Sequence, residues 1–392
     1  MNNPYQKTVY ACYIGYISQG IANNLAPLLF ITFIDLKWVS LSTVTLLTTV
    51  NFGMQLLTDF LSVYFVDKIG YRRCIVAAHV LDAAGLIGLA TLPDILPLPF
   101  LGLIISVLLY ALGGGLLEVL VSPIVEACPS DDKARAMSLL HSFYCWGVVA
   151  VVALSTFYIA IFGRENWRAL CWLWALVPAC NAVFFTRVPI NTLTEEGRGM
   201  TVRELFGNRL FLIFMLIMFA AGASELAMSQ WASAFAESGL RVSKELGDLA
   251  GPCAFALLMG FARALYAKKG ERLNIRNCIL FSSSLCTAAY LLSSLSEMPW
   301  LALLGCGICG FSVGIMWPGV FSLASASLPR GGTAMFALLA LAGDLGCTGG
   351  PTVVGFVSSA AGGSLRAGLF AAAVFPVVMI AGILLLRRIT KS

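Results

Sequence analysis

Charged residues are scarce in this chain. Of its 392 residues, only 25 are Lys or Arg and 20 are Asp or Glu, 11% in all, whereas 59% are apolar. A soluble domain carries about 25% charged residues, and a chain of this size cannot hide so many apolar side chains in a core of its own. The composition excludes a soluble globular protein and predicts an integral membrane protein.

Long polar stretches are also missing. Uninterrupted apolar segments of about 20 residues, the length that crosses the hydrocarbon core of a bilayer as a helix, occupy most of the sequence. We therefore expect an all-α membrane protein with twelve transmembrane helices at 9–34, 41–66, 74–92, 99–127, 134–162, 168–187, 209–236, 246–267, 276–296, 299–326, 332–359 and 366–387.

The distribution of basic residues predicts the orientation. With both termini in the cytoplasm, 18 of the 25 Lys and Arg residues lie in cytoplasmic loops and six in external loops. The remaining one, Arg263, lies inside a span, and the sequence does not identify the residue that pairs with it. This excess follows the positive-inside rule and favours a multi-pass protein of the plasma membrane. The net charge of +5 requires no nucleic-acid partner, because the loops face anionic lipid headgroups. The short polar start lacks a small-residue cleavage site, so we expect the first span to be retained.

The longest polar stretch divides the spans six and six. We expect an N-terminal six-helix bundle at 1–187, a cytoplasmic linker at 188–208 and a C-terminal six-helix bundle at 209–392. An offset of about 200 residues aligns Gly114 with Gly314, which indicates that the halves are repeats. Two related six-helix halves are typical of transporters that alternate access to a central site.

Motifs of enzymes and metal proteins are absent from the sequence. It holds no nucleophile elbow, metal-ligand cluster or phosphate-binding loop. Cys306 and Cys309 form a C-x-x-C pair, but no second pair and no nearby His accompany them, so we expect them to pack in the helix. We expect that the protein is not an enzyme and that it binds no cofactor and no metal.

A charged segment follows the second span. Residues 67–73 resemble the loop signature of the major facilitator superfamily, G-x-x-x-D-[RK]-x-G-x-[RK]-[RK], although Val63 replaces its first glycine. An aspartate beside a basic cluster can form a charge latch that holds one conformation, and ordinary positive-inside charge is the alternative. The expected latch residues are Asp67, Lys68, Gly70, Arg72 and Arg73.

Polar side chains inside the spans form the candidate site. A carboxylate in hydrocarbon costs several kcal/mol unless it is paired, hydrated or protonated, so such residues are functional candidates. Glu118 lies near mid-membrane and His141 within about one helical turn of that depth, so the two can share a proton. For Glu225, Asp344 and Trp317, structural pairing or packing is the alternative. The expected substrate-binding residues are Gln19, Asn23, Asn24, Glu118, His141, Tyr144, Glu225, Gln230, Trp317 and Asp344, with Glu118 and His141 also coupling the proton.

Three blocks resemble one branch of the superfamily, the fucose–proton symporter and glucose/galactose transporter group. Residues 22–25 match its A-N-N-L, residues 117–123 match its L-E-x-x-x-N-P except for serine in place of asparagine, and residues 315–323 match its I-M-F-P-x-x-F-S-L except for tryptophan in place of phenylalanine. The resemblance implies that Glu118 takes part in sugar binding and proton coupling, and that Asn23 and Asn24 border the sugar.

The same resemblance contains departures. His141 and Tyr144 stand where the fucose symporter has a glutamine and an asparagine, and Pro27 replaces the helix 1 aspartate of the branch. Glu118 with His141 can replace the lost acid, another ion can serve, or transport is uncoupled.

The predicted function is secondary active transport. We expect a monomer in the lipid bilayer that moves a small polar solute, a monosaccharide or related compound, by proton-coupled symport. The alternatives are a proton-coupled antiporter that exports drugs or metabolites and an uncoupled sugar facilitator. Against the antiporter, the span 134–162 lacks a G-P-x-x-G-G element, and the related Gly-Gly-Pro lies at 349–351.

Overall fold

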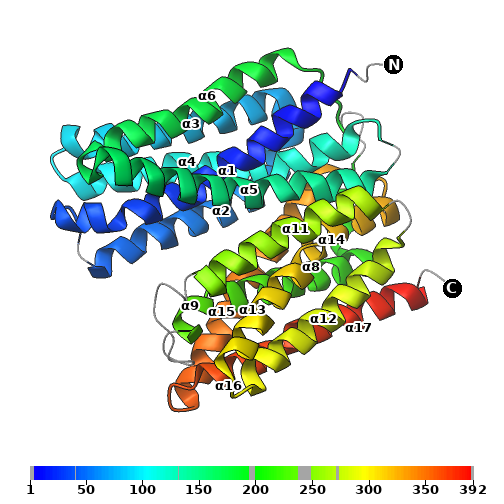
Figure 1. Ribbon diagram of the computed structural model, residues 1–392. Helices are drawn as coiled ribbons and strands as arrows, with labels where there is room; N and C mark the ends of the chain where they lie inside the picture. Colours follow the sequence, from blue (N-terminus) through cyan, green and yellow to red (C-terminus); the bar gives the residue numbers. More distant parts are fainter. Residues whose placement is uncertain are drawn as a thin grey trace. The chain divides into compact units, whose positions relative to one another are not determined.

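The protein is seen in a computed structural model that describes residues 4–39, 41–130, 132–193, 199–236, 249–270 and 273–389. Within these ranges the chain is helical and contains no β-strand (Figure 1). Residues 194–198 of the predicted linker, and the first three residues of the predicted span 246–267, lie outside the described residues.

The helices of the first half follow the predicted spans to within about three residues at each end. Hydropathy alone predicts the ends of these helices, because each apolar segment has the length that a helix needs to cross a bilayer. They are α1 (Gln6–Asp35), α2 (Leu41–Ile69), α3 (Tyr71–Ile95), α4 (Pro99–Ala127), α5 (Lys133–Phe162) and α6 (Trp167–Arg187), followed by the short linker helix α7 (Val202–Phe206).

The second half contains several interrupted helices. The predicted spans 209–236, 299–326 and 366–387 are each two helices, and a π-helical turn at Leu249–Cys253 precedes the next one. The helices are α8 (Arg209–Ser229), α9 (Ala232–Ala234), α11 (Ala254–Lys269), α12 (Ile275–Leu295), α13 (Pro299–Val313), α14 (Met316–Ser327), α15 (Gly332–Ala360), α16 (Leu365–Ala372) and α17 (Val374–Ile389).

Prolines account for two of these interruptions. In a continuous helix, the backbone N–H of residue 318 would donate to the Gly314 carbonyl, and that of residue 376 to the Ala372 carbonyl. Both positions are proline, which has no backbone N–H to donate. Each freed carbonyl lies at the break, between α13 and α14 and between α16 and α17. Each of these spans was predicted as one continuous helix, and that prediction of continuity is wrong.

Nine segments of the described residues are long and apolar enough to cross a membrane. Segments of 21 to 30 residues meet this criterion, and α13 with α14 and α16 with α17 count as one segment each. Their length and composition agree with a multi-pass membrane protein.

Contacts divide the chain into two compact units. The first holds Met1–Pro129, Phe143–Gly199 and Gly332–Ala337, and the second holds Ser130–Ser142, Met200–Gly331 and Leu338–Ser392. The start of α5 therefore belongs to the second unit and the start of α15 to the first. The predicted bundles at 1–187 and 209–392 remain a prediction, and the contact-based division differs from them at these two helix starts.

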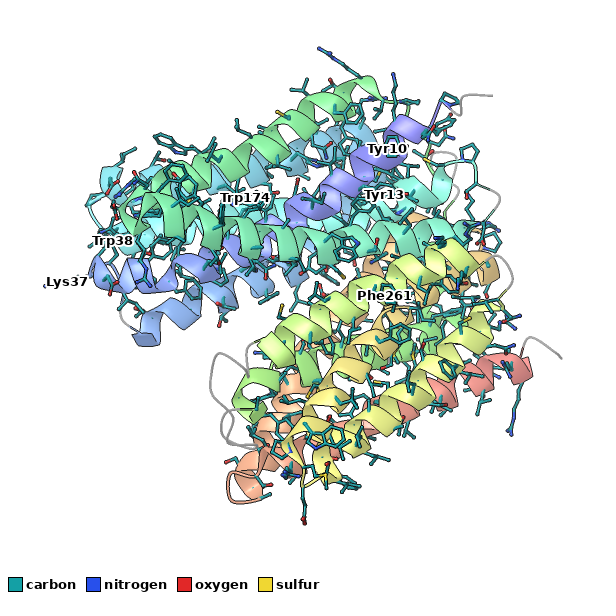
Figure 2. The ribbon with its side chains drawn as sticks, viewed as in Figure 1. Tyr10, Tyr13, Lys37, Trp38, Trp174 and Phe261 are labelled. Atoms are coloured by element: carbon teal, nitrogen blue, oxygen red, sulfur yellow. The ribbon has the colours of Figure 1, made fainter. Side chains whose placement is uncertain are left out.

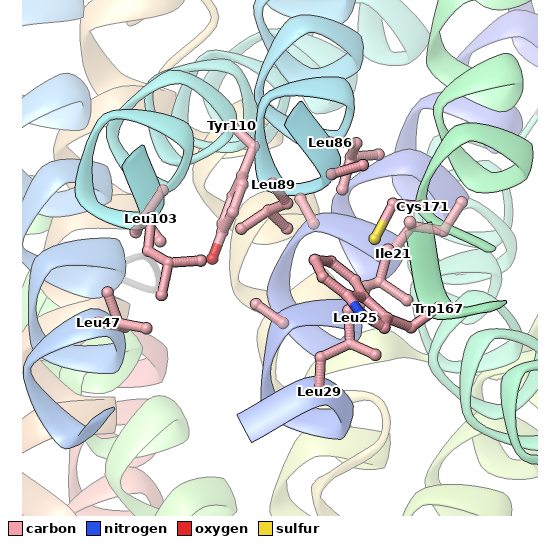
Figure 3. Close-up of a cluster of buried hydrophobic side chains, with 14 of the residues drawn as sticks. Ile21, Leu25, Leu29, Leu47, Leu86, Leu89, Leu103, Tyr110, Trp167 and Cys171 are labelled. Atoms are coloured by element: carbon pink, nitrogen blue, oxygen red, sulfur yellow. The ribbon is translucent and has the colours of Figure 1, made fainter. Parts of the chain in front are cut away.

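The core of the first unit surrounds α1. Ile21, Leu25 and Leu29 lie on one side of α1 and are fully buried against α3 and α6, where Leu86 and Trp167 contribute (Figure 3). Because lipid tails are as apolar as these side chains, their contribution in a bilayer comes from close van der Waals packing between the helices. This packing fixes the rotation of α1, and its polar residues consequently lie together with those of α2 and α4.

Candidate functional site

A carboxylate on α4 is hydrogen-bonded to an amide on α1. Gln19 Nε2 donates to Glu118 Oε2 at 2.7 Å, a length typical of a hydrogen bond to an ionised group. Gln19 is buried and Glu118 is half-buried. The packing of the first unit thus brings together two residues that the sequence analysis named separately.

An amide network lies next to this pair. Asn23 Oδ1 accepts hydrogen bonds from Gln55 Nε2 at 2.6 Å and from Asn51 Nδ2 at 3.2 Å. Gln55 Nε2 also lies 3.1 Å from Asn51 Oδ1. Asn24, by contrast, donates to the carbonyl of Gly20 on its own helix. Asn51 and Gln55 were not among the predicted binding residues, although two amides four residues apart in an apolar span were a signal in the sequence.

Aromatic contacts hold α5 beside α1 in the first unit. The rings of Tyr13 on α1 (Figure 2) and Phe143 on α5 are stacked with centroids 4.2 Å apart. Tyr16 and Tyr144 meet edge to face at 6.5 Å, and the Tyr16 hydroxyl lies 2.9 Å from Ser122 Oγ. The predicted residue Tyr144 therefore reaches the same α1–α4 region as Glu118.

In the second unit, the structure identifies a partner for the buried Arg263. Its Nη2 lies 3.4 Å from Glu225 Oε2 on α8, its Nε donates to the carbonyl of Gly314 at 2.9 Å, and its Nη1 donates to the carbonyl of His141 at 3.1 Å. Ser138 Oγ donates to the Arg263 carbonyl at 2.9 Å. The arginine thus joins α8, α11, the start of α5 and the break between α13 and α14.

His141 and Trp317 lie on either side of one aromatic ring. The imidazole of His141 is stacked on Phe321 at 5.8 Å, and Trp317 meets Phe321 edge to face at 6.3 Å. Both predicted residues are buried, with 5% and 8% of their surface exposed. Since His141 belongs to the second unit and Glu118 to the first, the expected sharing of a proton between them remains a prediction.

The remaining candidates on α8 and α15 differ in burial. Asp344 is half-buried, and it follows Gly343, against which the Trp317 ring packs. Gln230 is exposed at the end of α8, while its neighbour Trp231 donates from Nε1 to the carbonyl of Pro351 at 3.0 Å. Asp344 therefore has the more enclosed position of the two.

The charged segment after α2 contacts the start of α15 within the first unit. Thr333 Oγ1 donates to Asp67 Oδ1 at 2.6 Å, and the Tyr71 hydroxyl forms a hydrogen bond with the same Thr333 hydroxyl. Thr333 is 266 residues from Asp67 in sequence, and no local pattern indicated it. Neither Thr333 nor Tyr71 was among the predicted latch residues.

Arg72 caps a helix. Its guanidinium donates to the carbonyls of Phe185, Thr186 and Val188 at 2.7, 3.0 and 2.8 Å, where α6 ends. A cation at this position also favours the negative end of the helix dipole. Gly70 begins α3 with a φ of 92°, which side chains rarely adopt. Lys68 and Arg73, the other two predicted latch residues, are exposed.

His, Cys, Asp and Glu are the side chains that bind metal ions most often in proteins. Among the residues that the structure describes, no group of three or more His, Cys, Asp or Glu side chains is placed to hold a metal ion.

Comparisons with known proteins identify the fold. The E. coli fucose:proton symporter aligns with a TM-score of 0.81 at 16% identity over 97% of this chain and 98% of that one. A proton:xylose symporter bound to 6-bromo-6-deoxy-D-glucose aligns with a TM-score of 0.80 at 13% identity, covering 97% and 95%. The human organic anion transporter MFSD10 aligns with a TM-score of 0.73 at 17% identity, covering 97% and 99%. At these identities the likeness shows the fold.

Sequence comparison agrees with the structural one. The membrane protein MosC of Rhizobium meliloti is 25% identical over 325 residues, which are 82% of this chain and 76% of that protein. The family model of the major facilitator superfamily matches residues 10–351. The predicted fold class and family resemblance are confirmed: the chain belongs to the major facilitator superfamily and is a multi-pass membrane transporter, not an enzyme.

Proposed function

We propose that this transporter moves a monosaccharide or a related small polar compound by proton-coupled symport. The observation that carries the proposal is the Gln19–Glu118 hydrogen bond beside the amides of Asn23, Asn51 and Gln55. Amides and carboxylates form hydrogen bonds with hydroxyl groups, and several of them on one surface suit a polyhydroxylated solute. The likeness to fucose and xylose symporters supports this solute class.

Aromatic rings are proposed as binding surfaces in each unit. Tyr16 and Tyr144 lie beside the polar cluster of the first unit, and Trp317 and Phe321 lie in the second unit. The apolar face of a sugar ring packs on such side chains while its hydroxyls reach polar groups. Gln230 and Asp344 remain proposed binding residues on the second unit.

Glu118 is the proposed proton carrier. It is a carboxylate inside a membrane-spanning helix, and the Gln19 amide donates to it, so proton uptake changes how Glu118 binds both Gln19 and a solute hydroxyl. His141 is the second proposed coupling residue, because Pro27 occupies the place of the helix 1 acid.

The segment 67–73 is proposed as a conformational latch. The contact of Asp67 with Thr333 joins α2 to the start of α15, and Arg72 fixes the same segment to α6. Alternating access requires contacts that form in one state and break in another. Lys68, Gly70 and Arg73 complete the proposed latch.

We also propose that the protein is a monomer of the plasma membrane with cytoplasmic termini. Its two proposed six-helix bundles are residues 1–187 and 209–392, and residues 188–208 join them.

The experiment that tests the function is uptake of labelled monosaccharides, polyols and organic acids into proteoliposomes, with and without an inward proton gradient. A gradient of one pH unit supports at most about tenfold accumulation for one proton per solute. We expect Glu118→Gln to abolish this accumulation while solute exchange persists, because glutamine still pairs with Gln19. Glu297→Gln, the same change at an exposed position, is the control and should accumulate normally.

Three results would change the conclusion. Uphill uptake by Glu118→Gln would remove the coupling role from Glu118. Uptake by the unmodified protein that only equilibrates would identify an uncoupled facilitator. If no sugar, polyol or acid enters, while expressing cells gain tolerance to hydrophobic cations, the protein is an exporter.

A further inference from the structure

The Arg263 side chain is a permanent cation on α11 that is buried inside the second unit. Only 3% of its surface is exposed. Guanidinium groups stay protonated at every physiological pH, so this charge must always be balanced. Arg263 belongs to the second unit, whereas Gln19, Asn23 and Glu118, on which the proposed function depends, belong to the first.

The broken helix holds one edge of the guanidinium. Pro318 cannot donate to the Gly314 carbonyl, and that carbonyl accepts from Arg263 Nε at 2.9 Å instead. The His141 carbonyl accepts from Nη1 at 3.1 Å. Breaks in transporter helices commonly expose backbone groups that take part in ligand sites. Here the exposed carbonyl orients the arginine, and Nη2 faces Glu225.

The contact between Nη2 and Glu225 is loose. Its 3.4 Å exceeds the 2.7–2.9 Å that is typical of charge-assisted hydrogen bonds. Arg263 and Glu225 keep 4% and 15% side-chain exposure. An incoming carboxylate can replace that of Glu225 without leaving the guanidinium uncompensated, and the planar guanidinium suits bidentate binding of a carboxylate.

Aromatic side chains lie close to this arginine in the fold. Phe321 is stacked on His141, whose carbonyl binds Arg263, and Trp317 meets Phe321 edge to face. A sugar-sized acid presents a charged end and an apolar ring face, which are the two features that a guanidinium and aromatic rings recognise.

We propose that Arg263 binds a carboxylate of the transported solute and that Glu225 occupies this place when the solute is absent. The solute is then a monosaccharide-sized acid, such as a hexuronate, rather than a neutral sugar. This inference rests on the proposed function and narrows its substrate class.

The test compares glucuronate with glucose, which differ at C6 by a carboxylate in place of an alcohol. In proteoliposomes the unmodified protein should take up glucuronate in preference to glucose. Arg263→Gln should weaken glucuronate binding by roughly 10- to 150-fold, the effect of a lost hydrogen bond to a charged group. Arg263→Lys should retain part of the affinity for glucuronate, because it keeps the positive charge but lacks the planar guanidinium that binds a carboxylate in bidentate fashion. Glu225→Gln should tighten glucuronate binding, because it removes the competing anion. Arg203→Gln, at an exposed arginine on α7, is the control and should leave the preference unchanged.

A second measurement needs no variant. Glucuronate should raise the melting temperature of the purified protein at concentrations where glucose does not. Uptake of glucose without uptake or binding of glucuronate overturns the inference and leaves the proposed function standing. Equal uptake of both, unchanged by Arg263→Gln, also overturns it. If neither sugar nor acid is transported, the proposed function fails and the inference fails with it.

Discussion

Replacement of Thr333 by valine tests the latch. Thr333 is 1% exposed, and its hydroxyl binds both Asp67 and Tyr71. Valine has nearly the same shape but no hydroxyl. A hydrogen bond to a charged group contributes about 1.5–3 kcal/mol, but Asp67 is exposed and solvent screening reduces this to about 1 kcal/mol. The lost Tyr71 contact adds about 1 kcal/mol at most.

The expected consequence is a shift in the conformational equilibrium. A loss of about 1–2 kcal/mol changes the ratio of the state that contains this contact to the state that lacks it by roughly 5- to 30-fold. Single-molecule fluorescence in nanodiscs measures this ratio, with dyes attached through unnatural amino acids because the chain has 12 cysteines. Thr352→Val, the same change at an exposed position of α15, is the matched control.

A double-mutant cycle tests whether Thr333 and Asp67 are energetically coupled. Thr333→Val combined with Asp67→Ala, which removes the acceptor, isolates the energy that couples the two side chains. We expect about 1 kcal/mol in favour of the state that contains the contact. A coupling below about 0.3 kcal/mol, or an unchanged ratio in the single variant, would refute the latch.

Three further predictions concern individual positions. Gly70→Ala should destabilise the protein by about 1–3 kcal/mol, because φ is 92° there, and a melting curve with Gly53→Ala as the control measures it. Pro318→Ala supplies an N–H at the break between α13 and α14, so it should lower glucuronate uptake more than glucose uptake. Hydrogen bonds from Thr201 lower the pKa of Glu204, so they stabilise α7 above the unfolded pKa of this carboxyl and cease to do so as the pH falls through the lowered value. Hydrogen exchange of α7 against pH should show this loss, and the same protection at acidic and neutral pH would contradict it.

The helices of the first half were predictable because hydropathy is a property of each segment by itself. The span 99–127 coincides with α4, and 134–162 differs from α5 by one residue. The interruption of 299–326 was not predicted, although its cause was present in the sequence. Pro318 lies only two residues inside α14, and hydropathy is insensitive to a missing N–H. The partner of the freed Gly314 carbonyl is Arg263 on α11, and only the tertiary structure shows this contact.

The candidate site was partly predictable for a related reason. Residues that are expensive to bury in a membrane are few, and so Glu118, Gln19 and Asn23 were recognised as a class. Their hydrogen-bond partners were not, because each partner is set by which helices are neighbours. Gln19 and Glu118 are 99 residues apart, and a rotation of α1 by half a turn would separate them.

The sequence by itself determined that this is a membrane protein and where the helices of its first half run, and it singled out the few polar side chains within the apolar spans. These features follow from the cost of moving each residue from water to lipid, which depends on that residue and its near neighbours in sequence. The tertiary structure alone decided that Arg263 contacts Glu225 and the Gly314 carbonyl, and that Thr333 contacts Asp67. The reason is that an ion pair or hydrogen bond requires two atoms within a few ångströms, and only the packing of helices remote in sequence brings them that close.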